Sequence, residues 1–217
     1  MLVGGGECDQ TALIGDLAAG LPPVAADGGA EALLRLGVMP QAVIGDIDSL
    51  APETQARLAP GGLHRIAEQD STDFDKCLRN IRAPLVVAHG FLGARLDHQL
   101  AALTVLARHP DRRCLLVGRD DVVLLCPPAL TLPLEPGCRV SLWPLGPVTG
   151  QSTGLRWPIG GIGFEPAGRV GTSNQALGPV SLTMDAPLML VMLPAVCRDV
   201  AQAALLGAPG RWPARAG

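Results

Sequence analysis

The sequence predicts an α/β protein with two domains: an N-terminal domain on a parallel sheet (residues 1–118) and a C-terminal all-β sandwich (residues 119–217). In the first half, short apolar runs alternate with segments of helical spacing, the pattern of strands joined by right-handed helical crossovers. In the second half, strand-like runs are separated by proline and glycine, and no helix is expected before 196–206.

The expected strands of the first domain are its short apolar runs, which read MLV, PVAA, QAVI, LHRIA, PLVVAH and CLLVG. Helical spacing between these runs predicts helices over residues 10–19, 30–36, 52–59, 72–82 and 96–109. The last helix has the clearest pattern, because leucines repeat along one face at positions 96, 100, 103 and 106. The domain boundary is expected near Arg119.

The second domain is expected to contain strands at VVLLC, LTLPL, RVSLWPL, VSLTM and LMLVMLP. Their regular separation by turn residues favours a sandwich or a barrel-like sheet. The final segment, GAPGRWPARAG, is rich in small residues and proline and is expected to be a mobile C-terminal tail.

Composition excludes several classes of function. The net charge is −3 and no basic run occurs, so nucleic-acid binding is not expected. The N-terminus lacks a basic start and a long apolar stretch, and no window approaches the roughly 18 apolar residues of a membrane span. The 6 cysteines are scattered without a C-x-x-C pair. Such usage favours reduced thiols in a cytoplasmic protein.

Carboxylates follow three of the expected strands. Asp46 and Asp48 come directly after QAVI, Asp70 and Asp73 follow LHRIA, and Asp97 follows PLVVAH through a loop. Parallel strands point the same way, so these groups converge at the carboxyl edge of the sheet. Two carboxylates about 5 Å apart repel by roughly 3 kcal/mol at an effective dielectric constant near 20. A cluster of them favours a bound Mg²⁺, Mn²⁺ or Ca²⁺ ion, and Mg²⁺ commonly shares its ligands with substrate phosphates.

Structural roles are open for the same residues. Aspartate near a helix start is an ordinary cap, and Thr72 with Asp75 resembles a capping box. The glycines of VGGGE and ADGGAE either cradle phosphates with their backbone amides or simply form tight turns. Neither stretch matches a dinucleotide-binding or P-loop motif. Lys76 and Arg95 either neutralise phosphate charge or are solvated cations at helix ends.

Four stretches, in their order and spacing, resemble motifs of the thiamine pyrophosphokinase family: ADGGAE, GDIDS, STDFDKCL and GARLDH. In the second half, STGLRWPI and GRVGTSN are similar to the thiamine-side signature of that family. The resemblance implies pyrophosphoryl transfer from ATP to the hydroxyl of thiamine, giving thiamine diphosphate and AMP. It also implies an α/β domain followed by a β-sandwich, and a homodimer with active sites shared between subunits.

The resemblance assigns roles by motif position. The Mg²⁺-binding and catalytic carboxylates are Asp46, Asp48, Asp73 and Asp97. The residues around the nucleotide and its phosphates are Asp27, Gln69, Thr72 and Arg95. The thiamine pocket contains Trp157, Ser173 and Asn174. One departure is Ala94, which stands where many members of the family have a second glycine.

Two other functions agree with the residues themselves. One is a Mg²⁺-dependent phosphotransferase or phosphohydrolase that acts on a different acceptor. The other is a non-catalytic protein that binds a nucleotide or thiamine, although binding alone seldom needs so many carboxylates. Asp73 or Asp97 is the expected hydrogen-bond acceptor for the attacking hydroxyl. The residues do not choose between attack on the β- and the γ-phosphorus of ATP, and only the resemblance favours the first.

Overall fold

The computed structural model describes residues 1–48, 50–58, 61–93 and 95–215, so Ser49 and Ala94 of the motifs lie outside the described residues. The chain divides into two units. The first comprises Met1–Val105 and Leu116–Arg119, and the second comprises Leu106–Leu115 and Asp120–Gly217. Over the described ranges, the helices are all too short or too polar to cross a membrane.

The first unit is built on a parallel sheet with strand order β5-β1-β2-β3-β4. The strand next to β5, β6, has residues in both units. The strands are Leu2–Val3 (β1), Val24–Ala26 (β2), Ala42–Gly45 (β3), Leu63–Arg65 (β4), Val86–His89 (β5) and Cys114–Val117 (β6). Each coincides with one of the expected apolar runs, and the α/β fold class is confirmed. The chain builds the sheet outward from β1 to β4 and then returns to place β5 on the other side of β1.

The helices of this region are Gln10–Ala18 (α1), Gly29–Arg35 (α2), Pro52–Arg57 (α3), Asp73–Asn80 (α4) and Leu96–Arg108 (α5). All five were expected, with ends that differ by a few residues. The leucine stripe of α5 is not buried along its whole length. Leu96 and Leu100 are 68% and 56% exposed, whereas Leu106 is buried.

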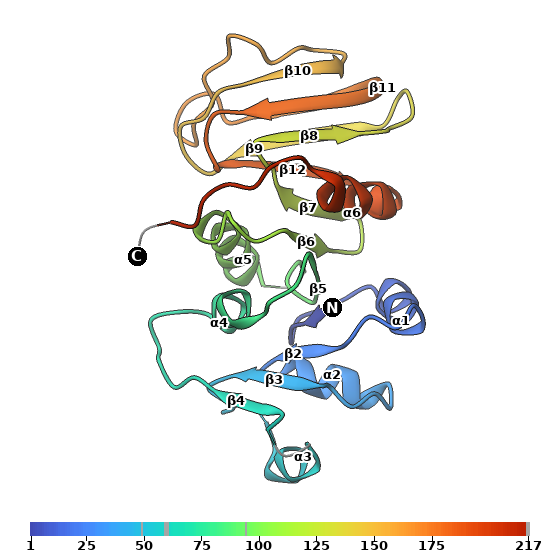
Figure 1. The fold of residues 1–217 in the computed structure, drawn as a ribbon, viewed down its shortest axis with the longest axis vertical. Coiled ribbons are helices and arrows are strands. Elements are labelled where there is room, and N and C mark those ends of the chain that lie inside the picture. Colours follow the sequence, from blue (N-terminus) through green and yellow to red (C-terminus); the bar gives the residue numbers. More distant parts are fainter. Residues whose placement is uncertain (49, 59–60, 94, 216–217) are drawn as a thin grey trace. The chain divides into compact units, whose positions relative to one another are not determined.

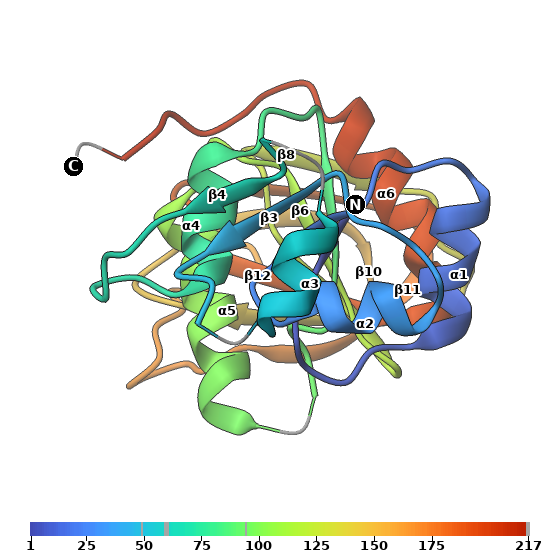
Figure 2. The same ribbon diagram turned by 90° about the horizontal axis from the view of Figure 1, so that it is seen from below.

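Side chains of the parallel strands alternate between two faces of the sheet. One face packs with α1 and α2 in a buried cluster that includes Val3, Leu13, Ala25, Leu33 and Val43. The opposite face, which carries Ile44, packs against α4, and the Cys77 thiol donates to the Ile44 carbonyl over 3.9 Å. Figures 1 and 2 show α1 and α2 on one side of β2 and β3, with α4 on the other.

The second unit contains antiparallel ladders. Its strands are Asp121–Leu125 (β7), Ala129–Leu132 (β8), Arg139–Pro144 (β9), Gly150–Leu155 (β10), Thr172–Met184 (β11) and Met189–Pro194 (β12). A 3₁₀ turn, Ala195–Cys197 (η1), leads into the helix Arg198–Gly207 (α6). The sequence pattern does not predict β10, because its residues, GQSTGL, contain no apolar run. Hydrogen bonds to β11 hold these polar residues in a strand, which their own sequence does not indicate.

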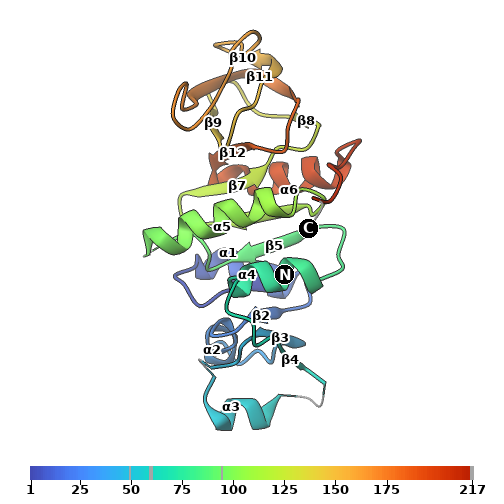
Figure 3. The ribbon, with the colours of Figure 1, turned by 90° about the vertical axis from the view of Figure 1, so that its left-hand side faces the viewer.

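The long strand β11 takes part in two ladders. Its first residues, Thr172–Gln175, pair with β9, and Val180–Thr183 pair with β8. The strand β10 pairs with residues 181–184 of β11 and, after an irregularity near Gly154, with Ala176. Figure 3 shows β10 and β11 side by side and α6 beside β12. One strand therefore joins the β7-β12-β9 ladder to β8 and β10.

Gly29 is required where α2 passes close to β1. A Cβ atom at this position would lie 2.0 Å from the Val3 carbonyl oxygen, which belongs to the rigid backbone of the sheet. We predict that Gly29→Ala lowers the free energy of unfolding by about 2–3 kcal/mol, because the helix must move away from the strand. Urea unfolding followed by circular dichroism measures this change.

Gly15→Ala in α1 is the matched control, because a Cβ atom at Gly15 would point into open space, with no neighbouring atom within 4 Å. Removing a flexible glycine from a helix should raise stability by about 0.5–1 kcal/mol. Equal stability of the two variants would contradict the close packing of α2 on β1.

Candidate active site

Carboxylates from the ends of β2 and β3 meet at one corner of the first unit. Asp27 follows β2, and Asp46 and Asp48 follow β3. One oxygen atom from each side chain lies within 4.8 Å of the others. Because β2 and β3 are parallel neighbours, their carboxyl ends lie at the same edge of the sheet. Of the three carboxylate groups that the sequence predicts to converge, the pair after β3 lies in this cluster, and it is joined by Asp27 after β2, which that prediction did not include.

The backbone of this corner has an unusual conformation. Ile47 has a φ of +66° and Asp27 a φ of +38°, in the left-handed region that side chains with a Cβ seldom adopt. The Ile47 side chain is buried in the cluster beneath α1 and α2. The Asp48 amide donates to Asp46 Oδ1 over 3.3 Å. The buried Ile47 side chain therefore anchors the turn in the core. Asp46 and Asp48, on either side of it in the sequence, keep their carboxylates at the edge of the sheet.

Gly45 allows the neighbouring carboxylates to approach this corner. A Cβ atom at Gly45 would lie 2.9 Å from Asp27 Cβ and 3.1 Å from Asp73 Oδ1. A larger residue at the end of β3 would push both aspartates away. Asp73, the first residue of α4, therefore lies next to the cluster although it is not one of its three closest members.

A buried lysine neutralises part of this negative charge. The side chain of Lys76 is only 2% exposed, and its Nζ lies 3.0 Å from Asp73 Oδ1 and 3.9 Å from Asp46 Oδ2. The start of its helix is capped as expected, because Thr72 Oγ1 accepts from the Asp75 amide over 3.2 Å. Lys76 is thus a partner of the carboxylates and not a solvated cation at a helix end.

The two carboxylates that contact Lys76 differ in pKa. Desolvation acts to raise the pKa of Asp46, but hydrogen bonds from the Asp48 amide and from Gln69 Nε2 (3.2 Å), with the charge of Lys76, lower it overall. For Asp73, desolvation raises the pKa and outweighs the pairing with Lys76; the charge of Asp27 adds to the increase. Asp46 is the more firmly ionised group, and Asp73 is the stronger base.

Arg95 and Asp97 form a separate pair at the start of α5. Arg95 donates from Nε to Asp97 Oδ1 over 3.2 Å and from Nη2 to Oδ2 over 2.6 Å. Both side chains are 66% exposed, and the hydrogen bond from Arg95 lowers the pKa of Asp97. Asp97 is not in the group formed by Asp27 and its two partners among the described residues. Its catalytic and metal-binding role stays a prediction.

In the second unit, Asn174 holds the backbone of Trp157. The Asn174 side chain is 3% exposed; its Oδ1 accepts from the Trp157 amide over 3.2 Å, and its Nδ2 donates to the Trp157 carbonyl over 2.7 Å. The Trp157 ring is 56% exposed, and the Arg156 guanidinium lies 5.0 Å from its centre. Ser173 is exposed on β11. The structure therefore joins Trp157 to Asn174 and leaves the indole ring accessible.

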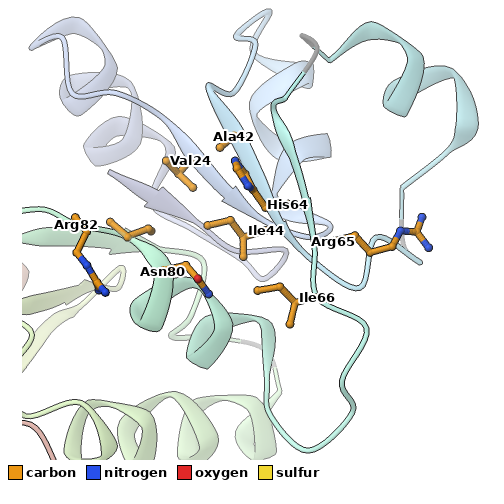
Figure 4. Close-up of a pocket in the computed structure, with 9 residues that line it drawn as sticks. Val24, Ala42, Ile44, His64, Arg65, Ile66, Asn80 and Arg82 are labelled. Carbon is orange, nitrogen blue, oxygen red and sulfur yellow. The ribbon is translucent and has the colours of Figure 1, made fainter.

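A cavity of about 520 Å³ opens on the α4 face of β2, β3 and β4 (Figure 4). Its lining consists of Val24, Ala42, Ile44, His64, Arg65, Ile66, Asn80, Ile81 and Arg82. The lining includes no carboxylate and none of the predicted site residues. The carboxylate geometry, and not this cavity, therefore defines the candidate active site.

The carboxylate corner fits a divalent cation. Asp27 Oδ1 is buried and has no hydrogen-bond partner among the described residues. Leaving a buried carboxylate oxygen unpaired is unfavourable, and a cation with its bound water would satisfy it. Oxygen ligands from Asp27, Asp46 and Asp48 suit Mg²⁺ better than zinc.

Two residues of this site, Asp27 and Lys76, have roles in the structure that the sequence pattern does not predict. The resemblance alone places Asp27 near the nucleotide, although Asp27 directly follows the apolar run PVAA, much as Asp46 follows QAVI with only Gly45 between them. That shared position was the available signal. For Lys76, no signal in the sequence separated a buried lysine from a solvated one, because its environment depends on how α4 packs on the sheet.

The fold and the site together define the class: an α/β protein with an acidic site at the carboxyl edge of its parallel strands. A family model described as thiamin pyrophosphokinase, catalytic domain, matches residues 23–116. Thiamine pyrophosphokinase 1 of Arabidopsis thaliana is 30% identical over 161 residues, which are 65% of this chain and 60% of the relative. The chain thus matches about three fifths of the length of that relative.

Solved structures agree with this match. Thiamin pyrophosphokinase from Geobacillus thermodenitrificans superposes with a TM-score of 0.68 and 25% identity, over 89% of this chain and 95% of the other. Thiamin pyrophosphokinase from Candida albicans gives a TM-score of 0.72 over 89% and 88% of the two chains; at 16% identity this likeness concerns the fold. All three kinds of comparison indicate the thiamine pyrophosphokinase family, and the resemblance seen in the motifs is confirmed.

We predict that Lys76→Met destabilises the protein by roughly 2–3 kcal/mol at neutral pH, because the partly buried carboxylates of Asp46 and Asp73 lose the cation that offsets their repulsion. The loss should shrink as the pH falls and the carboxylates become protonated. Urea unfolding across pH measures both effects. The double variant Lys76→Met/Asp73→Asn should recover much of the loss, since it also removes one of the negative charges.

Arg82→Met serves as the control, because Arg82 is exposed and its removal should change stability by less than about 0.5 kcal/mol. If Lys76→Met were as stable as this control, Lys76 would not balance the charge of the carboxylates.

Proposed function

We propose that this protein is a thiamine pyrophosphokinase, which transfers a pyrophosphoryl group from ATP to the hydroxyl of thiamine and releases AMP. The observation that carries the proposal is the carboxylate corner, in which Asp27, Asp46 and Asp48 converge and one buried oxygen of Asp27 has no partner among the described residues. The likeness to thiamine pyrophosphokinases supports the choice of nucleotide and acceptor.

The first unit has the role of a nucleotide- and Mg²⁺-binding domain in this proposal. Asp46, Asp48 and Asp73, together with Asp27 and Asp97, hold or neighbour the metal. When bound, Mg²⁺ would offset the negative charge of the ATP phosphates. Gln69, Thr72 and Arg95 contact the nucleotide. The low pKa of Asp46 supports a ligand that stays ionised at neutral pH.

Asp73 is the proposed acceptor for the proton of the attacking hydroxyl. Its raised pKa makes it a better base than Asp46, and its Oδ1 is held by Lys76. The thiamine oxygen forms a bond to the β-phosphorus, the bond from this phosphorus to the oxygen of the α-phosphate breaks, and AMP leaves. The hydroxyl proton passes to Asp73 and then to solvent.

The second unit has the role of a β-sandwich domain that binds thiamine and forms the dimer. The exposed indole of Trp157 offers a flat surface for an aromatic ring of thiamine. Asn174 fixes the Trp157 backbone, and Ser173 is exposed on the same strand as Asn174. The two ladders joined by β11 support the sandwich assignment.

The proposal has two further parts. The protein forms a homodimer with active sites shared between its subunits, and it is located in the cytoplasm. The dimer rests on the resemblance of the motifs to the thiamine pyrophosphokinase family. The free cysteines support a reducing compartment.

Phosphorus NMR of the purified protein with ATP and Mg²⁺, with and without thiamine, tests the activity. Thiamine-dependent formation of AMP and thiamine diphosphate would establish both the group transferred and the acceptor. Formation of ADP or free phosphate without thiamine would indicate a phosphotransferase or phosphohydrolase with another acceptor. No turnover with any divalent metal would indicate a binding protein.

We predict that Asp48→Asn lowers the turnover number on the order of a hundredfold or more, because it removes a charged metal ligand. The circular dichroism spectrum should not change, since Asp48 is exposed. Asp70→Asn is the control, because Asp70 is an exposed carboxylate outside the cluster, and its rate should stay within about twofold of wild type. A nearly normal rate for Asp48→Asn would remove Asp48 from the metal site.

Trp157→Ala should raise the KM for thiamine by about tenfold, the loss expected for one aromatic contact, and leave the KM for ATP nearly unchanged. Steady-state kinetics with each substrate varied in turn provides the comparison. Trp143→Ala is the control, since Trp143 is a second partly exposed tryptophan, on β9. Equal weakening of both substrates would refute the thiamine-side role of Trp157.

A further inference from the structure

Two thiols of the second unit face each other across a long sequence separation. The Sγ atoms of Cys138 and Cys197 lie 3.3 Å apart, although the residues are 59 positions apart in the chain. Cys138 directly precedes β9, and Cys197 ends η1 and stands at the start of α6. Both are free and partly buried. The spacing of the cysteines in the sequence gives no sign of this pair.

The geometry is close to that of a disulfide. An S–S bond is about 2.05 Å long, so the sulfur atoms need to approach each other by little more than about 1 Å. Both cysteines stand at the ends of elements, where the backbone adjusts more easily than inside a ladder. Within the part of the chain that the structure describes, no side chain caps the start of α6, whose preceding residue is Cys197.

We propose that Cys138 and Cys197 form a redox-active dithiol that closes reversibly to a disulfide and ties the start of β9 to the start of α6. With glutathione disulfide as oxidant, one protein thiolate attacks a glutathione sulfur, and the first glutathione leaves. The second protein thiolate then attacks the protein sulfur of the mixed disulfide, and the second glutathione leaves. The two protein thiols lose two electrons and two protons, and one glutathione disulfide becomes two glutathione thiols.

The environment of the pair sets the rate of this exchange. Burial, with a further contribution from the facing Cys197 thiol, raises the pKa of Cys138 to about 11. The positive charge of Arg139 opposes this increase, but Arg139 is paired with Asp121 of β7. Thiolate is the reactive form, so the pair exchanges slowly near neutral pH. An equilibrium measurement therefore tests the pair better than a rate.

The disulfide would restrain the ladder between β9 and β11, which also contains Asn174. The Cys138 carbonyl accepts from the Ala176 amide over 2.8 Å, and Val140 of β9 stands opposite Asn174 of β11. Asn174 in turn holds the backbone of Trp157. Closing the bond would restrain the strand pair behind Trp157; an effect on thiamine binding rests on the proposed function, whereas formation of the bond does not.

A redox titration tests the proposal. The protein is equilibrated in buffers with increasing ratios of glutathione disulfide to glutathione and is then quenched with acid. Thiol titration and peptide mass mapping measure which thiols have been lost. Wild type and the control Cys8→Ser should each lose two thiols at one common glutathione ratio, with a peptide that joins Cys138 to Cys197. Cys138→Ser and Cys197→Ser should lose none at that ratio. Cys8 is a suitable control because it is a partly buried free thiol in the other unit.

Two results would overturn the proposal. One is a wild-type protein that keeps all 6 thiols in the most oxidising buffer. The other is the same loss of thiols in Cys138→Ser as in wild type. Urea unfolding provides a second readout: oxidised wild type should unfold at a higher urea concentration than the reduced form, because the bond restricts the unfolded chain. Unfolding of both forms at the same concentration would contradict a bond that ties β9 to α6.

Discussion

Mutual repulsion of carboxylates at the ends of β2 and β3 is the constraint around which the first unit is organised. Asp27, Asp46 and Asp48 converge within a few ångströms, and Asp73 stands beside them. In the folded chain, Lys76 offsets part of this charge from beneath, where it is almost completely buried. One buried oxygen of Asp27 has no hydrogen-bond partner within the described ranges and is available to the proposed cation. Stability and the proposed cation binding are therefore coupled in the same group of side chains.

The backbone keeps these charges together against their repulsion. Ile47 holds a left-handed conformation while its side chain is buried under α1 and α2, so the core stabilises the turn that carries Asp46 and Asp48. Gly45 leaves the room that Asp27 and Asp73 need. Strain in the turn and packing in the core thus serve one purpose, which is a preorganised acidic edge. A site that forms before its ligand arrives loses less entropy when it binds.

The second unit depends on one long strand, β11, which takes part in two ladders. The first part of β11 pairs with β9, and its last part pairs with β8. Asn174 lies in the first part, and its buried amide fixes the backbone of Trp157 while the indole stays exposed. The Cys138–Cys197 pair lies at the end of the same β9 ladder. Changes at this end of β9 therefore have a direct hydrogen-bonded route to the backbone of Trp157.

The sequence by itself determined the α/β class, the strands and helices of the first unit, and the position of Asp46 and Asp48 at the carboxyl edge of the sheet. These features depend on short-range patterns: apolar runs, helical spacing and the direction of parallel strands. It did not reveal β10, whose polar residues are ordered by β11. Nor did it reveal the burial of Lys76 or the contact of Cys138 with Cys197. Tertiary structure decided these, because burial and contacts between distant residues depend on packing, which local patterns do not encode.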